Sequence, residues 1–188
     1  MTSIPQFWRE KNWIELFLIA YTRSLLQTFN LYLIKKSIKY SELEHLYHGW
    51  MGINTCTNNL AELTALWLLL YWAQILHIKE MRIFGDSLLV MGWLLGKTMI
   101  NASNLTHRCS RIKELIKQFE QINFEHIYRE HNMEADILSK KGIGCPEGHL
   151  QIEEILGGCI IRSITRDILI GLLHCDICLM STCKLWYV

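Results

Sequence analysis

Between about residues 42 and 142, the sequence alternates short apolar runs with longer segments of helical spacing. Strand-like runs cover about 42–55, 81–84 and 124–128, and helical runs cover about 59–77, 87–95, 103–121 and 132–140. Because strands that alternate with helices favour parallel pairing, this order predicts an α/β domain with helices on its sheet. In such sheets the functional crevice lies at the carboxyl ends of the strands.

The two ends of the chain lack this regular order. Trp13, Phe17 and Ala20 fall near helical spacing, which predicts one amphipathic helix over about 7–30. Residues 143–188 are apolar without a clear period, and we expect a loosely attached helix or two there. The sequence therefore divides into a divergent helical segment at 1–41, an α/β domain at 42–142 and an apolar extension at 143–188.

The composition limits the possible classes of function. The chain has 188 residues, of which 51% are hydrophobic and 20% are charged, so it can bury a core and is not disordered throughout. Its net charge of +1 excludes a globally basic nucleic-acid binder, but it allows a local basic face.

Neither a membrane span nor export is expected. The longest charge-free apolar run is Leu63 to Ile78, which is shorter than the roughly 20 residues of a membrane span and fits a buried helix. The first residues show no secretory signal, so we expect an intracellular protein of the nucleus or cytoplasm, with its seven cysteines reduced. Cys175-x-x-Cys178 leaves a zinc fragment open, but with no second ligand pair the sequence favours plain thiols.

Three acidic residues stand at predicted element ends. Glu62 lies in the first turn after a predicted Asn58-Asn59 helix cap, Asp86 directly follows the strand at 81–84, and Asp136 follows a cap at Asn132. Each alone is typical of a capping or dipole role. Three carboxylates that converge among apolar neighbours repel one another unless a cation lies between them, and Mg²⁺ prefers such oxygen ligands.

The segments around these acids resemble a known family. Thr57 to Leu66 is similar to the "TNNxAE" segment of ribonuclease H domains, Gly85 to Val90 to their "GDSxLV" segment, and His126 to Ser139 to their "HIxRExNxxAD" segment. Together, the three segments most resemble the reverse-transcriptase-like ribonuclease H domains of plant genomes and retroelements. The resemblance covers about residues 47–141.

The resemblance implies a mixed five-stranded sheet with helices on its faces and cleavage of RNA in RNA/DNA hybrids. It implies two Mg²⁺ ions, or Mn²⁺, held by four carboxylates, of which Glu62, Asp86 and Asp136 are three catalytic metal ligands. His131 matches a loop histidine that assists proton transfer and product release in some relatives. A plain surface position is the alternative for His131.

One departure from the family concerns its first metal-binding aspartate, which lies on the first strand. This sequence has no Asp before Asp86, and its acids ahead of Glu62 are Glu10, Glu15, Glu42 and Glu44. The sequence thus predicts that the first strands are missing or replaced and that metal affinity is weakened. Glu44 is the candidate substitute for the family's first aspartate. Two hypotheses stay open: a hybrid-cleaving enzyme of weak or lost activity, and a non-catalytic binding module or decayed retroelement-derived protein.

A basic stretch from Lys97 to Lys117 offers a substrate face. It has five basic side chains against one acidic one, and Arg108, Arg111 and Lys113 are its candidates for phosphate contacts with a hybrid or RNA. The resemblance adds Asn58, Asn59 and Ser87 as nucleic-acid contacts. A solvated helix face is the alternative for the basic residues. The tryptophans of the predicted helices, Trp67, Trp72 and Trp93, are expected in the core.

Overall fold

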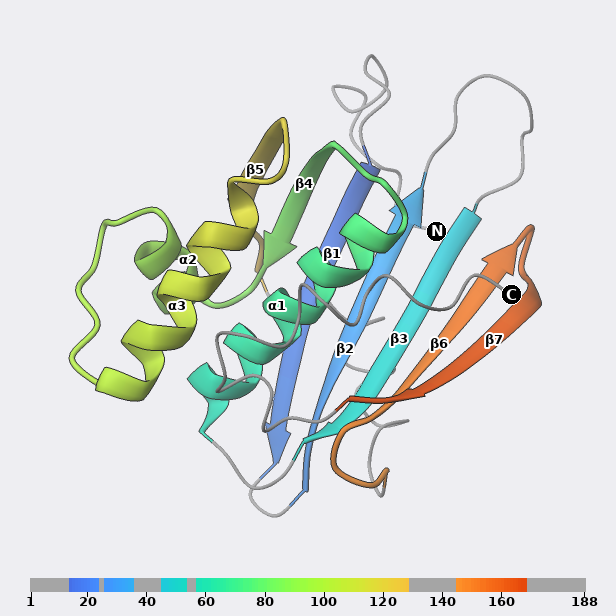
Figure 1. The fold of residues 1–188 in the computed structure, drawn as a ribbon, viewed down its shortest axis with the longest axis horizontal. Helices are drawn as coiled ribbons and strands as arrows, with labels where there is room; N and C mark the ends of the chain where they lie inside the picture. Colours follow the sequence, from blue (N-terminus) through green and yellow to red (C-terminus); the bar gives the residue numbers. More distant parts are fainter. Residues whose placement is uncertain (1–13, 24–25, 36–44, 54–56, 129–144, 169–188) are drawn as a thin grey trace.

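One seven-stranded mixed sheet organises the chain. In the computed structural model, which describes residues 14–23, 26–35, 45–53, 57–128 and 145–168, the strand order is β5-β4-β1-β2-β3-β6-β7 (Figure 1). The strands are β1 (Ile14–Arg23), β2 (Leu26–Lys35), β3 (His45–Ile53), β4 (Glu80–Gly85), β5 (Gln121–His126), β6 (His149–Leu156) and β7 (Cys159–Asp167). The β1–β4 and β4–β5 pairs are parallel and all other pairs are antiparallel.

Three helices accompany the sheet: α1 (Asn58–Ile75), α2 (Leu88–Leu94) and α3 (Ser103–Ile116). Helix α1 contacts β1 and β2 on one side and α3 on another, and Figure 1 shows α2 and α3 beside it. Because α1 lies between the sheet and α3, ten of its eighteen residues are buried. This explains why the apolar run from Leu63 reads as a core helix rather than a membrane span. In the described parts of the chain, no helix has both the length and the apolar character to cross a membrane.

Short polar residues set the starts of the first two helices. The Thr57 hydroxyl accepts a hydrogen bond from the Leu60 amide, so Thr57 rather than Asn58 or Asn59 caps α1. The Ser87 hydroxyl likewise accepts from the Val90 amide and caps α2. Helix α2 ends before Gly96, whose φ of +70° is the left-handed conformation that glycine favours after a helix.

The predicted α/β class and the elements of the middle region are confirmed. Every predicted strand and helix between residues 45 and 128 is present, although α3 ends at Ile116 instead of about 121. The helix predicted at 132–140 lies outside the described residues. One sheet joins strands from all three predicted parts of the chain.

The prediction of a helix over about 7–30 was wrong for the described residues, and the first strands of the sheet are present. Residues 14–23 and 26–35 form β1 and β2, an antiparallel pair in the middle of the sheet. Strand β1 lies between β4 and β2, and its residues Leu16 to Ala20 form a continuous apolar run. Such a run has no polar alternation, so its period alone does not separate a strand from a buried helix.

The prediction of helices after residue 143 was also wrong for the described part. Residues 149–167 form the hairpin β6–β7, which pairs with β3 and adds two strands to the sheet. Gly157 and Gly158 have φ values of 58° and 82°, as a two-residue turn between twisted strands requires. Alternation in β6, where Leu150 and Ile152 are buried, was the signal that the sequence carried.

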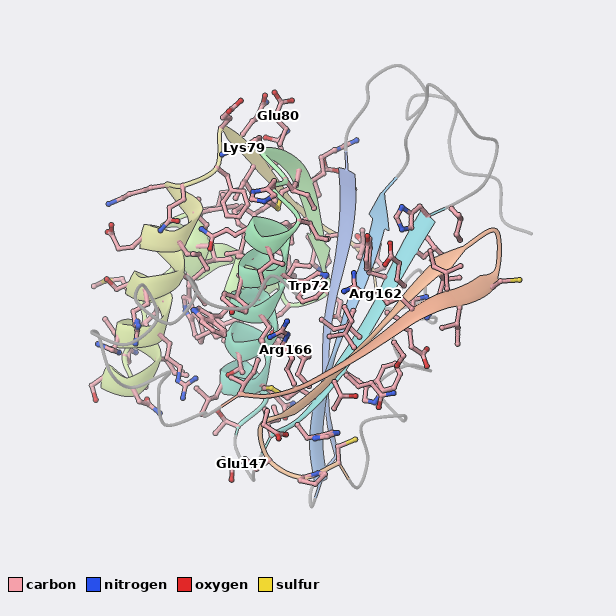
Figure 2. All side chains as sticks on the ribbon, turned by 45° about the vertical axis from the view of Figure 1, so that its right-hand side comes forward. Trp72, Lys79, Glu80, Glu147, Arg162 and Arg166 are labelled. Atoms are coloured by element: carbon pink, nitrogen blue, oxygen red, sulfur yellow. The ribbon has the colours of Figure 1, made fainter. Side chains whose placement is uncertain are left out.

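A polar cluster joins the hairpin to β3. One carboxylate oxygen of Glu154 on β6 accepts hydrogen bonds from His45 Nε2 at 2.8 Å and from the Tyr47 hydroxyl at 2.9 Å. Burial, followed by the hydrogen bond to Glu154 and its charge, raises the pKa of Tyr47, while Arg162 on β7 opposes this shift. Glu154 and Arg162 are register partners, and Figure 2 shows Arg162 and Arg166 on β7. The cluster therefore ties three neighbouring strands together.

Candidate metal and nucleic-acid site

Two of the predicted acids meet where β4 ends and α1 begins. Strand β4 ends at Gly85, Asp86 follows it, and Ser87 starts α2. Glu62 is the fifth residue of α1, so it lies in the second turn rather than in the predicted first turn. The Asp86 charge acts on Glu62, and a side-chain hydrogen bond links Glu62 to Ser87. This end of β4 is the carboxyl end of a parallel strand, as the sequence predicted for the functional crevice.

Glu62 is held in an environment that favours its neutral form. Burial raises its pKa from 4.5 to about 7, the Ser87 hydrogen bond lowers it, and the Asp86 charge raises it further. The Oε2 atom of Glu62 is buried and has no hydrogen-bond partner among the described residues. A buried carboxylate oxygen without a donor suits a cation as partner, so the pair fits part of a Mg²⁺ site.

Ser87 makes two interactions with one hydroxyl group. Its oxygen accepts from the Val90 amide at 3.3 Å, which leaves its proton for the Glu62 carboxylate. The start of α2 therefore fixes the orientation of Glu62 on α1. Both interactions of Ser87 lie within the protein, and its contact with nucleic acid stays a prediction.

The end of β5 holds the turn that carries Asp86. Nε2 of His126 lies 3.3 Å from the backbone oxygen of Asp86, and the Ile127 amide donates to the Gly85 oxygen at 3.0 Å. The His126 ring also packs edge-on against Tyr128, with ring centroids 5.6 Å apart. Sequence reasoning missed His126, although it ends a strand parallel to β4, and parallel strands bring their carboxyl ends to one edge of the sheet.

Strand β1 brings no carboxylate to this edge. Leu18 is the β1 residue in register with Gly85, which places Ile19 next along β1 at the level of Asp86. The acid of β1, Glu15, is in register with Arg82. It lies four residues before Ile19, so it is about 13 Å along the strand from the level of Asp86, at 3.3 Å per residue. Arg82 itself donates to Glu125 on β5. The candidates Glu42 and Glu44 lie outside the described residues.

Two further predicted site residues, Asp136 and His131, also lie outside the described residues. Within the described ranges, no group of three or more His, Cys, Asp or Glu side chains gathers as a metal site would require. The described part of the site is therefore the pair Glu62 and Asp86.

The predicted nucleic-acid contacts fall into two groups. Asn58 and Asn59 begin α1 beside the acidic pair, where Asn58 is exposed and Asn59 is half-buried. Arg108, Arg111 and Lys113 lie on α3, where Lys113 is exposed and the two arginines are half-buried. The two arginines line a small pocket with Leu63, Trp67 and Ile112. The predicted core position was confirmed for Trp72 and Trp93, each 5% exposed, whereas Trp67 is half-buried at this pocket.

Comparisons with solved structures identify the same architecture. The RNase H1 of the halophilic archaeon Halobacterium salinarum is 24% identical, with 69% of this chain and 96% of that chain covered and a TM-score of 0.58. An N-terminal RNase H domain from Mycobacterium tuberculosis is 22% identical, with 69% and 93% covered and a TM-score of 0.57. LC11-RNase H1, solved in complex with an RNA/DNA hybrid, is 23% identical, with 69% and 96% covered and a TM-score of 0.58. These likenesses establish the RNase H fold.

Sequence comparison assigns the family. No curated protein matches the chain. The profile of the family described as reverse transcriptase-like matches residues 43–142, which is more than half of the chain. This span contains Glu62, Asp86 and the arginines of α3, and it excludes the β6–β7 hairpin. The chain thus belongs to the reverse transcriptase-like family and has the RNase H fold, and its sheet continues beyond β3 into the β6–β7 hairpin.

Proposed function

We propose that this chain is an RNase H-type domain that binds RNA/DNA hybrids or RNA and whose cleavage activity is weak or lost. The observation that carries the proposal is the register of β1. Glu62 and Asp86 are retained as a pair, but Leu18 and Ile19 stand on β1 beside the turn that carries Asp86. Two retained acids support the family function, and an apolar β1 argues against full metal affinity.

Glu62 and Asp86 would hold a Mg²⁺ or Mn²⁺ ion, together with Asp136 by family resemblance. A bound ion would activate water and stabilise the leaving oxygen of a phosphodiester. The chain's own contribution is to orient Glu62 through Ser87 and to fix the Asp86 turn through His126. His131 stays a proposed proton-transfer residue, and Asn58, Asn59, Arg108, Arg111 and Lys113 stay proposed contacts to nucleic acid.

A non-catalytic binding module, including a decayed retroelement-derived one, is the second candidate. The same feature favours it, because β1 places no carboxylate beside Asp86. Without that ligand the remaining acids repel one another and bind a cation less tightly.

A hybrid-cleavage assay separates these functions. We expect the full chain to bind a fluorescently labelled RNA/DNA hybrid and to cleave its RNA strand slowly with Mn²⁺ and more slowly with Mg²⁺. Asp86→Asn should abolish that cleavage and leave hybrid binding in place. Binding without cleavage under either ion would favour the module, and the absence of binding to hybrid and RNA alike would contradict both functions.

A further inference from the structure

Exposed apolar side chains border the turn that carries Asp86. Tyr128, two residues beyond the end of β5, is 69% exposed, and Leu88 and Leu89, which begin α2, are 68% and 43% exposed. Strands β4 and β5 pair in parallel and α2 contacts β5, so these side chains come to the same edge of the sheet (Figure 1). Several exposed apolar side chains grouped beside a candidate site indicate a contact surface.

Tyr128 is connected to the Asp86 turn through one ring. Its ring meets that of His126 nearly at a right angle, with an interplanar angle of 82° and ring centroids 5.6 Å apart. Nε2 of the same histidine lies 3.3 Å from the Asp86 backbone oxygen. The Ile127 amide donates to the Gly85 oxygen at 3.0 Å, so the chain that leads to Tyr128 is hydrogen-bonded to the end of β4. Only the imidazole ring therefore separates Tyr128 from the turn.

The imidazole ring reaches the turn from the side of the sheet that carries α1. Side chains of a strand alternate between the two faces of a sheet, so His126 shares the face of Phe124. Phe124 packs against the core cluster, which includes buried residues of α1. Glu62 also comes from α1, so Glu62 and His126 approach the Asp86 turn from the same side. A strand that is held at the acidic pair on this side passes close to Tyr128.

The Tyr128 ring has a face open to a ligand. An edge-on neighbour covers at most one face of a ring, and this side chain is 69% exposed. The contact with His126 restrains the tyrosine, so little side-chain freedom remains to be lost when a base stacks on it. Every base has a π-face, so such a ring holds a nucleotide without reading its sequence.

We propose that Tyr128 stacks on a base of a bound nucleic-acid strand, close to the nucleotide whose phosphate reaches the acidic pair. The inference rests on the proposed nucleic-acid function and names the residue that holds the strand beside the site. Phosphates of one duplex strand repeat about every 3.4 Å along the axis, so a strand at Asp86 has further nucleotides within the span of the two rings. Stacking needs no cation, so it retains the strand even where metal affinity is weak.

Photo-crosslinking tests the contact directly. RNA, and RNA/DNA hybrids with 5-iodouracil bases in either strand, crosslink on irradiation to aromatic side chains that contact the base, and mass spectrometry locates the modified residue. We expect a crosslink at Tyr128 in the full chain, its loss in Tyr128→Leu and its retention in Tyr128→Phe, which keeps the ring. Crosslinks found only at other residues would overturn the proposal.

Binding measurements separate stacking from a general charge effect. We expect Tyr128→Leu to weaken binding of labelled nucleic acid about tenfold, and Tyr128→Phe to weaken it by no more than about threefold. The slope of log affinity against log salt should stay the same, because this side chain neutralises no phosphate. Ile161→Ala is the control, since it removes an exposed apolar side chain from β7, at the opposite edge of the sheet from β5, and should leave affinity nearly unchanged. Equal losses in Tyr128→Leu and Ile161→Ala would overturn the proposal.

The Mn²⁺ affinity of the variants separates stacking from a positioning role. Tyr128→Leu should bind Mn²⁺ as the unchanged chain does, because His126 rather than Tyr128 contacts the Asp86 turn. A joint loss of nucleic-acid and Mn²⁺ affinity would show that Tyr128 acts through His126, and it would overturn the stacking contact. Nucleic acid that binds the unchanged chain and Tyr128→Leu equally would overturn the contact and leave the nucleic-acid function standing. A chain that binds neither hybrid nor RNA would contradict both.

Discussion

Leu18 of β1 lies in register with Gly85 of β4, one residue before Asp86. The family's first metal-binding aspartate is expected on this strand, so the register identifies where the missing ligand belongs. The backbone of the site is in place, since β1 runs parallel to β4 in the middle of the sheet. What β1 lacks beside Asp86 is a carboxylate, because Leu18 and Ile19 stand there.

Restoring a carboxylate on β1 should therefore strengthen ion binding. Successive strand residues point to opposite faces, so Leu18→Asp and Ile19→Asp test both directions. One of them should bind Mn²⁺ about tenfold more tightly than the unchanged chain, and the other should only destabilise the fold, by about 1–3 kcal/mol. Calorimetric Mn²⁺ titration measures the gain, and adding Asp86→Asn should remove it. Unchanged affinity in both variants would contradict the location of the missing ligand.

Glu62 should make stability depend on pH near neutrality. Its pKa is raised from 4.5 to about 7, so between these values the folded state holds a proton that the unfolded chain releases. This contribution to stability is present below about pH 4.5 and is lost as the pH rises through about 7, by at most about 3 kcal/mol. Glu62→Gln should be the more stable protein at about pH 8 and should differ little at about pH 4. Urea unfolding at both values tests this, and parallel pH curves for the two proteins would contradict it.

The middle of the fold was predictable because its local signals agree. The strand at Glu80–Gly85 ends at a glycine, and α2 begins after a capping serine. The spacing of apolar residues, the turn residue and the helix cap therefore indicate the same boundaries. Strand β1 was not predictable in this way, because its apolar run from Leu16 to Ala20 has no polar alternation that would separate a strand from a buried helix. The hairpin β6–β7 was predictable in principle from Gly157-Gly158 after the alternating run of β6, but β7 has no such alternation to match it.

The candidate site was predictable in part for similar reasons. Glu62 and Asp86 stand in motifs where both local structure and neighbours are distinctive, and the structure brings them together. The role of Ser87 depends on how α1 packs beside the start of α2, which no local pattern encodes. The partners of His126 and Trp67 likewise come from distant segments, namely the Asp86 turn and helix α3.

Ser87 should affect both the start of α2 and the acidity of Glu62. Ser87→Ala removes a helix cap, at a cost of about 1 kcal/mol, and removes the hydrogen bond that lowers the Glu62 pKa. We therefore expect a less stable protein with a higher Glu62 pKa, measured by NMR titration of its side-chain carboxyl. Thr57→Ala is the matched control, because it removes the cap of α1 without touching the Glu62 carboxylate. A similar pKa in Ser87→Ala and the unchanged chain would contradict the bridging role.

His126 should position the Asp86 turn. His126→Phe keeps an aromatic ring but loses the contact with the Asp86 oxygen, which should cost about 1 kcal/mol of stability. Since groups behind metal ligands affect affinity, we expect at least a tenfold loss of Mn²⁺ affinity and partial recovery in His126→Gln, which keeps a donor. His149→Phe breaks a pair with the exposed Asp167 on the hairpin and should leave ion binding unchanged. Equal Mn²⁺ affinities for the His126 and His149 variants would contradict the role of His126.

Tyr47 should anchor the β6–β7 hairpin to β3. Its hydroxyl donates to Glu154 at 2.9 Å, and Tyr47 is 6% exposed, so Tyr47→Phe leaves a half-buried carboxylate with one fewer donor. We expect the free energy of unfolding in urea to fall by about 1–2 kcal/mol. Relative to the unchanged chain, amide hydrogen exchange should accelerate more in β6 and β7 than in β4. Tyr128→Phe, at a residue that is 69% exposed, should leave both measurements unchanged. If exchange instead accelerated equally in β4 and in the hairpin, the cluster would stabilise the sheet as a whole rather than the attachment of β6 to β3.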